Sequence, residues 1–168
     1  MAVEASQSPF RAYEAGTSGA REGTPRRPWG IADVPVAYDP PLSSPSDLIQ
    51  VPNGTLELRF PNGDLAPSDT TDPTALISKY PCVQQGEPIR QLANIKKAPV
   101  FFITTEASVH ALYNQCLVFY LQQAGVDVEW AKLAERGIRG NGHFSMLEKN
   151  SGEIARLIEG WFGESGLA

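Results

Sequence analysis

A continuous apolar run at Ala98–Thr105 restricts the fold more than any other segment of this chain. The run is rich in β-branched and aromatic residues and ends at Glu106. A strand with one face in water would alternate apolar with polar residues, whereas a strand covered on both faces of a parallel sheet is apolar throughout. The run therefore predicts a buried parallel strand and an α/β fold.

The chain after this run is regular. Apolar residues within 109–124, spaced three and four apart, predict a helix that ends at Gly125. Alternation over Val126–Trp130 predicts a second strand nearer the sheet edge, and a loop with His143 follows it. A final helix is predicted with Ser151 as its N-terminal cap. Its apolar stripe comprises Ile154, Leu157, Ile158, Trp161 and Phe162.

Residues 11–96 hold nearly all of the chain's 14 prolines and show no sustained helical or strand period. Such composition forms loops. Proline beside aromatic residues suits an extended strap packed over another surface, and a plain linker is the alternative. Two short elements are predicted within this part. One is a hairpin strand at Gly54–Phe60, and the other is one or two helical turns at Glu87–Ala93 with Ile89 and Leu92 facing inward.

Charge and cysteine spacing exclude several classes of function. A formal net charge of -5 argues against a nucleic-acid partner. No apolar run is long enough to span a membrane. The N-terminal residues lack the basic region and apolar stretch of an export signal. We therefore expect a cytoplasmic location, although a longer parent protein could be secreted. Cys82 and Cys116 lie far apart in the sequence and do not show the spacing of metal-binding Cys or His residues. We expect no disulfide framework, metal site or cofactor, and Cys116 as a small core residue.

The candidate site is the loop Arg139–Phe144, which carries His143. Imidazole is the side chain best suited to moving a proton near neutral pH. Gly140 and Gly142 let the backbone turn sharply and present the ring. Active groups of open parallel sheets gather at the carboxyl ends of the strands, so we expect Glu106 and His143 at the same edge, where the carboxylate could orient the imidazole.

Each of these residues also has a structural interpretation. Glu106 opens the next helix, where a carboxylate is favourable without any catalysis. His143 could be a loop histidine that is hydrogen-bonded for structure. His110 lies near the start of the helix after Glu106, and we expect it to be a partly exposed helical residue or a cap contact.

The C-terminal third resembles the end of an α/β-hydrolase of the esterase type. Pro99–Glu106 is similar to the penultimate strand with its acid position, Val126–Trp130 to the last strand, and Gly140–His143 to the histidine loop before the closing helix. The earlier residues resemble one branch of that superfamily, in which a glutamate after the preceding strand serves as the triad acid. Glu4 matches this position, and Ala5 stands where the branch has a proline.

The resemblance implies a partial α/β-hydrolase fold, with about three parallel strands, flanking helices and an irregular proline-rich cap segment. Residues 1–10 would form a remnant strand and acid loop, and residues 11–96 the cap. Residues 97–168 would form the C-terminal unit of strand, helix, strand, loop and helix.

An α/β-hydrolase carries its nucleophile on a G-x-S-x-G elbow, and this chain has none, since Gly16–Gly19 has the wrong spacing. The resemblance thus implies a C-terminal fragment of a carboxylic ester hydrolase, with His143 as triad histidine and Glu4 or Glu106 as alternative acids, inactive alone towards a small-molecule ester. The alternative is a non-catalytic module that binds a ligand or a protein. The exposed edge of the first strand would favour a complementing N-terminal half or a homo-oligomer.

Overall fold

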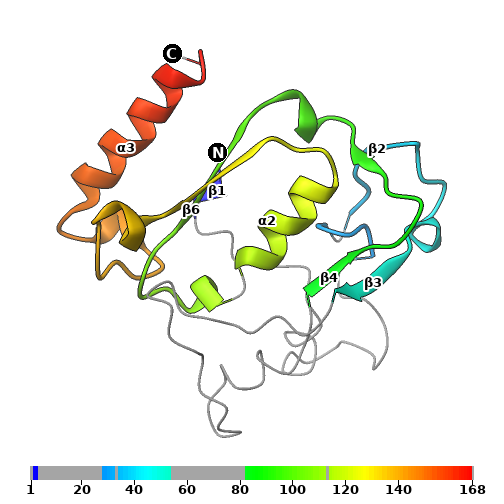
Figure 1. Cartoon of the computed structure of the whole chain (residues 1–168), viewed down its shortest axis with the longest axis horizontal. Coiled ribbons are helices and arrows are strands. Elements are labelled where there is room, and N and C mark those ends of the chain that lie inside the picture. The colour runs from blue at the N-terminus through cyan, green and yellow to red at the C-terminus, as the bar shows by residue number, and fades with distance from the viewer. Residues whose placement is uncertain (1, 4–27, 33, 54–81, 113, 168) are drawn as a thin grey trace, which may run out of the picture.

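The computed structural model describes residues 2–3, 28–32, 34–53, 82–112 and 114–167 (Figure 1). Its centre is a parallel sheet with the strand order β1-β6-β7, formed by Ala2–Val3, Val100–Thr104 and Val128–Lys132. The register pairs Ile103 of β6 with Val3 on one side and with Ala131 on the other. The apolar run is thus the middle strand, and the predicted small parallel sheet is confirmed.

Helices cover both faces of this sheet, α3 (Ser151–Glu164) on one side and α2 (Asn114–Gln123) on the other (Figure 1). Phe101 is fully buried against α3, where its ring stacks on Trp161 with centroids 5.2 Å apart. Val100 packs in the second core, beside α2. Because successive side chains of a strand point to opposite faces, β6 needs apolar residues at every position.

The helix that follows β6 is less continuous than its periodicity predicts. A 3-10 helix, η4 (Val109–Leu112), comes first, and α2 begins only at Asn114. The predicted end is confirmed, because Gly125 adopts φ +78° directly after the last turn. A left-handed residue at this position terminates a helix at low cost only when it is glycine.

The N-cap of the C-terminal helix α3 lies one residue before the predicted one. Asn150 is the N-cap residue and Ser151 is the first helical residue, and the Asn150 side chain makes no capping hydrogen bond. Its amide is used elsewhere, as described below. The apolar stripe is confirmed, with Ile154 and Trp161 buried and the other members half-buried against the sheet. None of the described helices is long and apolar enough to cross a membrane.

The described part of the cap contains two small antiparallel sheets. β2 (Tyr38–Asp39) pairs with β5 (Gln91–Leu92), and β3 (Gln50–Asn53) pairs with β4 (Cys82–Gln85). The helical turns predicted at Glu87–Ala93 are wrong, because β5 is extended here. Pro88 explains this, since proline lacks an N–H and disfavours helix in the residue before it.

Leu92 faces inward as predicted and is 1% exposed. The strand predicted at Gly54–Phe60 lies outside the described residues. Two further 3-10 helices belong to the described part of the cap, η2 (Pro45–Asp47) and η3 (Ile95–Lys97).

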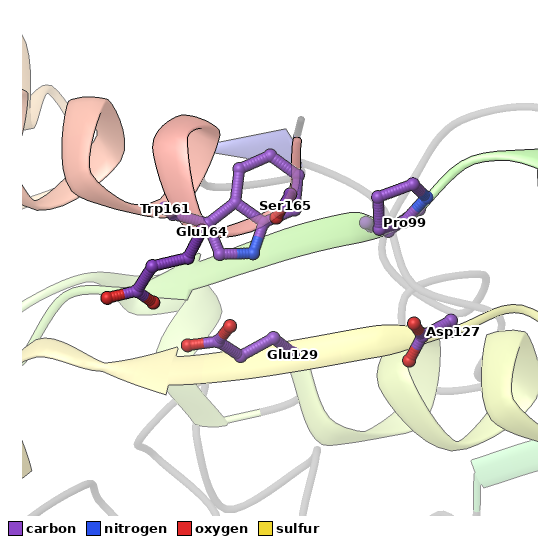
Figure 2. A pocket seen from close by; sticks show the side chains of 7 residues that line it. Pro99, Asp127, Glu129, Trp161, Glu164 and Ser165 are labelled. Atoms are coloured by element: carbon purple, nitrogen blue, oxygen red, sulfur yellow. The ribbon is translucent and has the colours of Figure 1, made fainter. Parts of the chain in front are cut away.

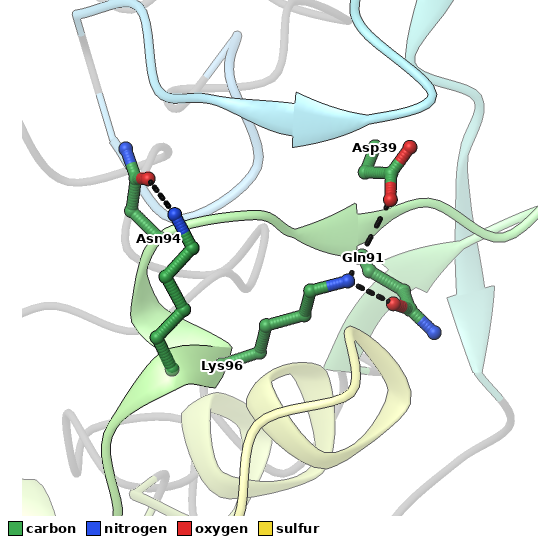
Figure 3. A network of polar contacts seen from close by, with 5 residues as sticks. Asp39, Gln91, Asn94 and Lys96 are labelled. Carbon is green, nitrogen blue, oxygen red and sulfur yellow. Dashed lines mark hydrogen bonds and ion pairs between the residues drawn. The ribbon is translucent and has the colours of Figure 1, made fainter.

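A polar network joins η3 to the β2–β5 pair (Figure 3). The Lys96 ammonium donates to the Gln91 side-chain oxygen at 2.5 Å and lies 3.6 Å from an Asp39 carboxylate oxygen. Lys97 donates to the Asn94 side chain at 3.1 Å. These groups are largely exposed, so each contact is worth at most about 1 kcal/mol and serves to fix the register of short strands.

The hydroxyls of two tyrosines connect the segment at Trp29–Gly30 with α2. The Tyr38 hydroxyl donates to the Trp29 carbonyl at 2.9 Å and lies 3.1 Å from the Tyr120 hydroxyl. Gly30 adopts φ +79°, and a Cβ at this position would collide with the Tyr120 hydroxyl. Burial raises the pKa of Tyr38, and burial beside Tyr38 raises the pKa of Tyr120. The packing of this segment over another surface agrees with the prediction, but the described residues 28–30 form a turn where an extended strap was expected.

The second cap hairpin is also fixed to α2. The Gln123 side chain accepts a hydrogen bond from the Gln85 N–H at 2.8 Å and donates to the Gln85 carbonyl at 2.9 Å.

Cys116 of α2 is 2% exposed and disulfide-bonded. Cys116 is a core residue as predicted, whereas the expectation of no disulfide is wrong. A disulfide depends on tertiary proximity, which the spacing of cysteines along the chain does not show.

Candidate functional site

The histidine loop is held at the carboxyl edge of the sheet, where β6 and β7 end. Glu106 follows β6 by two residues, and each of its carboxylate oxygens accepts a hydrogen bond from the loop. One accepts from the Gly140 N–H at 2.8 Å, and the other from the Arg139 guanidinium at 3.0 Å. Glu106 and the histidine loop are therefore brought together as predicted. The described contacts of this carboxylate are with the loop's Arg139 and Gly140.

Backbone contacts on both sides of the loop fix the residues that precede the histidine. The Ala107 N–H donates to the Asn141 carbonyl at 2.9 Å, and the Thr105 hydroxyl donates to the Gly142 carbonyl at 3.0 Å. The Gly142 N–H donates to the Glu148 carboxylate at 3.1 Å. The chain enters His143 with both peptide groups of Gly142 engaged, so the position of the histidine Cα is well determined.

The two glycines of the loop act differently. Gly140 adopts φ +75°, as expected for a sharp turn. Gly142 does not have a positive φ; a Cβ there would instead lie 3.4 Å from a Glu148 carboxylate oxygen. The expectation that both glycines serve to turn the backbone is thus confirmed only for Gly140, and a Cβ on Gly142 would make an ordinary contact with the Glu148 carboxylate.

A reciprocal pair of amides connects the loop to α3. Asn141 is 1% exposed, and its side-chain N–H donates to the Asn150 oxygen at 2.6 Å. Asn150 donates back to the Asn141 oxygen at 3.1 Å. Because a buried amide that loses its partner costs about 1–3 kcal/mol, this pair is expected to hold the loop against the helix. The sequence signal was weak, since Asn150 directly before Ser151 suggests only a helix cap.

The imidazole of His143 is half-buried and lies between two aromatic rings. The His110 ring is 4.2 Å away between centroids at an interplanar angle of 64°, and the Phe144 ring is 4.9 Å away at 63°. His110 lies in η4 and is 8% exposed. The expectation of a partly exposed His110 is wrong, because η4 turns this side chain towards the loop after β7.

The two alternative acids have different surroundings. Both carboxylate oxygens of Glu106 are engaged by the loop, and its side chain is 23% exposed. Glu4 lies outside the described residues. The residue before it, Val3, ends β1 and pairs with Ile103, so β1 ends at the same edge of the sheet as β6.

A cleft of about 380 Å³ lies at the opposite end of these strands, under the last turn of α3 (Figure 2). Its lining includes the carboxylates of Asp127, Glu129 and Glu164 together with the Trp161 ring. Glu129 also forms an ion pair of 2.7 Å with Arg136. Because this cleft is at the amino ends of β6 and β7, it does not belong to the site at His143.

The sequence lacks a serine elbow, and the described residues lack a metal cluster beside the histidine. No G-x-S-x-G segment occurs anywhere in the 168-residue sequence. Within the described ranges, no group of three or more His, Cys, Asp or Glu side chains could hold a metal ion. The described residues thus place an imidazole at the sheet edge on a loop whose backbone is held by hydrogen bonds.

Comparison with known proteins gives one informative similarity. The chain is similar to "Probable secreted lipase phiG" from a fungal species, with 39% identity over 136 residues, which cover 80% of this chain. It spans about a third of that relative's length, 32%. No family model matches the chain, and no solved structure matches it significantly.

The similarity supports a lipase- or esterase-like hydrolase. A small parallel sheet with helices on both faces is compatible with part of an α/β-hydrolase. The resemblance seen in the sequence around His143 and the similarity to a lipase thus agree at the level of a hydrolase-type protein.

Proposed function

We propose that this chain is the C-terminal part of an α/β-hydrolase-type carboxylic ester hydrolase and supplies its histidine and acid. The observation that carries the proposal is the position of His143, on a loop fixed at the carboxyl edge of a parallel sheet. In acyl transfer such a histidine takes the proton of the attacking serine hydroxyl and later gives it to the leaving group. Similarity to a lipase supports the same reaction class.

The contacts of Glu106 favour Glu4 as the triad acid. A triad carboxylate accepts the imidazole N–H and stabilises the imidazolium that forms. One Glu106 oxygen accepts a hydrogen bond from the Gly140 N–H and the other from Arg139, and these contacts suit Glu106 for holding the loop. Glu4 directly follows a strand that ends at the same edge.

The serine nucleophile would come from a second polypeptide or from an N-terminal half of a longer protein. β1 is at the edge of the described sheet, with β6 on one side only. An edge strand offers unpaired N–H and C=O groups to another strand. A hydrolase half could dock there, and self-association of this chain is the competing use of the same edge.

Co-expression with a hydrolase half that carries a G-x-S-x-G segment tests this function. We expect hydrolysis of small carboxylic esters by the complemented protein, and reduction to background in His143→Gln. The 168-residue chain alone should show no activity. Activity of the complemented protein that does not depend on His143 would contradict the proposal, and activity of the chain alone would mean that it contains its own nucleophile.

The absence of a serine elbow from the sequence favours a second candidate, a non-catalytic module that binds a small apolar ligand or a protein under its cap. Binding by the isolated chain, measured with a fluorescent apolar probe, would support it if affinity were unchanged in His143→Gln. Saturable binding that requires His143 would instead connect the ligand with the candidate site.

A further inference from the structure

We infer that His110 is a positioning residue for His143, and that contact between the two imidazoles holds the His143 ring in one orientation. The catalytic meaning of this inference rests on the proposed function. The contact itself is a property of the folded chain and is measured independently of ester hydrolysis.

The geometry of His110 limits how far its ring can move. The residue is 8% exposed, and its N–H donates to the Ser108 hydroxyl at 3.1 Å. The Ala111 N–H donates to the Ser108 carbonyl at 3.0 Å, which closes the turn around His110. A buried side chain on a hydrogen-bonded turn has few rotamers open to it, so its ring offers a fixed surface.

His143 meets this surface from the neighbouring loop. Its ring is edge-to-face with His110 at 4.2 Å and with Phe144 at 4.9 Å. The Phe144 side chain is 62% exposed and can move, whereas His110 is buried. Of these two ring neighbours, His110 is therefore the better fixed, and it can restrict rotation of the His143 ring.

Restriction of this ring matters for a general base. Proton transfer requires that the reacting atoms lie within hydrogen-bond distance and in line, and misplacement by about 1 Å can lower a rate about 100-fold. The contacts of Gly142 fix the backbone at the histidine, and the orientation of the ring depends on its side-chain torsions as well. The His110 ring restricts these torsions through its edge-to-face contact with His143.

Aromatic NMR of the isolated chain tests this directly, because the chain has two histidines. We expect ring-to-ring nuclear Overhauser effects between His110 and His143 in the wild type. In His110→Ala the His143 ring signals should shift and report averaging between rotamers, while the Gly142 amide signal stays in place. His110→Phe, which keeps a ring at this position, should restore a single rotamer.

The matched control is Phe144→Leu, which removes the exposed ring neighbour and should change the His143 rotamer less than His110→Ala does. A His143 ring that keeps its signals and its single rotamer in folded His110→Ala would overturn the inference. If His110→Ala does not fold, the wild-type spectrum decides, and absence of the ring-to-ring effect would overturn it as well.

The complemented hydrolase provides a second readout. There, His110→Ala should lower kcat by up to about 100-fold with little change in KM, and His110→Phe should recover most of it. Ring contact in the NMR spectra without ester hydrolysis would reject the proposed function and leave the positioning contact intact. Hydrolysis that is insensitive to His110 would reject the positioning role alone.

Discussion

The sheet region and the cap of this molecule are stabilised in different ways. Around the sheet, apolar side chains recur with the period of their strand or helix, as in the stripe of α3 that packs on Phe101. In the described cap, a core shared with α2 includes Leu48 and Leu92, and single polar contacts, among them Tyr38 to Tyr120 and Gln85 to Gln123, fix the short strands. The first kind of contact is spread over many residues. The second depends on individual groups, so the two regions should respond differently to substitution.

The largest effect is expected in the sheet region. Phe101→Ala should lower the free energy of unfolding by about 3–5 kcal/mol, because the ring is fully buried and stacks on Trp161. Urea unfolding followed by tryptophan fluorescence measures this. Phe144→Ala is the matched control, since that ring is 62% exposed and its removal should change stability by no more than about 0.5 kcal/mol. Equal losses in the two variants would show that this core is not packed as described.

The cap should be most sensitive to its disulfide. Cys116→Ser should lower the free energy of unfolding by about 2–4 kcal/mol, since the cross-link no longer restricts the unfolded chain. Denaturation of the wild type with and without reductant should reproduce the difference. Thiol titration of unfolded protein purified without reductant should detect no free thiol, and two reactive thiols would contradict the bond.

The same bond bears on where the chain matures. Disulfides persist in oxidising compartments and are rare in the cytosol. The cytoplasmic location expected from the N-terminal residues stays a prediction, and Cys116 argues for the secretory route. Expression in an oxidising compartment should therefore yield more folded protein than cytosolic expression, and the advantage should disappear in Cys116→Ser.

Substitution of two glycines that share a backbone conformation allows a direct comparison of the cap with the sheet region. Gly30 and Gly140 have φ +79° and φ +75°, but a Cβ on Gly30 would lie 2.6 Å from the Tyr38 hydroxyl, whereas one on Gly140 would meet nothing within 4 Å. Gly30→Ala should cost about 1–3 kcal/mol from backbone strain and collision, and Gly140→Ala about 1 kcal/mol from strain alone. Thermal unfolding of both variants checks the order, and a reversed order would contradict the close packing of the strap on α2.

The difference between the regions also explains what could be predicted from the sequence. β6, the end of α2 and the stripe of α3 could be predicted, because local periodicity reports burial. The contact between His110 and His143, the amide pair of Asn141 and Asn150, and the disulfide could not. Each depends on how loops and helices pack in the tertiary fold, and no spacing along the chain encodes that proximity. The loop at His143 could be placed at the sheet edge, because parallel strands bring their carboxyl ends together.

A smaller effect is expected from the tyrosine pair at high pH. Burial raises the pKa of Tyr38 and Tyr120 in the folded chain. The unfolded chain therefore loses these protons first, and the stability contributed by the neutral hydroxyls is complete below about pH 10 and falls as the pH rises towards the folded values. For Tyr120, whose pKa is strongly raised, the loss should reach about 1.4 kcal/mol near pH 11. Urea unfolding between neutral and alkaline pH should give a shallower decline in Tyr38→Phe, and an unchanged slope would contradict burial of this hydroxyl.

The smallest effect on stability is expected at Glu106. Substitutions there distinguish a residue that holds the histidine loop from a triad acid. Glu106→Gln keeps an oxygen for the Gly140 N–H and removes only the partly exposed ion pair with Arg139, so it should cost at most about 1 kcal/mol. Glu106→Ala also removes the acceptor and should expose the Gly140 amide to hydrogen exchange. In the complemented hydrolase, a loop-holding Glu106 predicts that Glu106→Gln keeps most of kcat. Replacement of the triad acid by its amide lowers kcat about 10⁴-fold, because the imidazole then adopts the wrong tautomer. A loss of that size in Glu106→Gln would assign the acid to Glu106 and exclude Glu4, and the same loss in Glu4→Gln alone would establish the reverse.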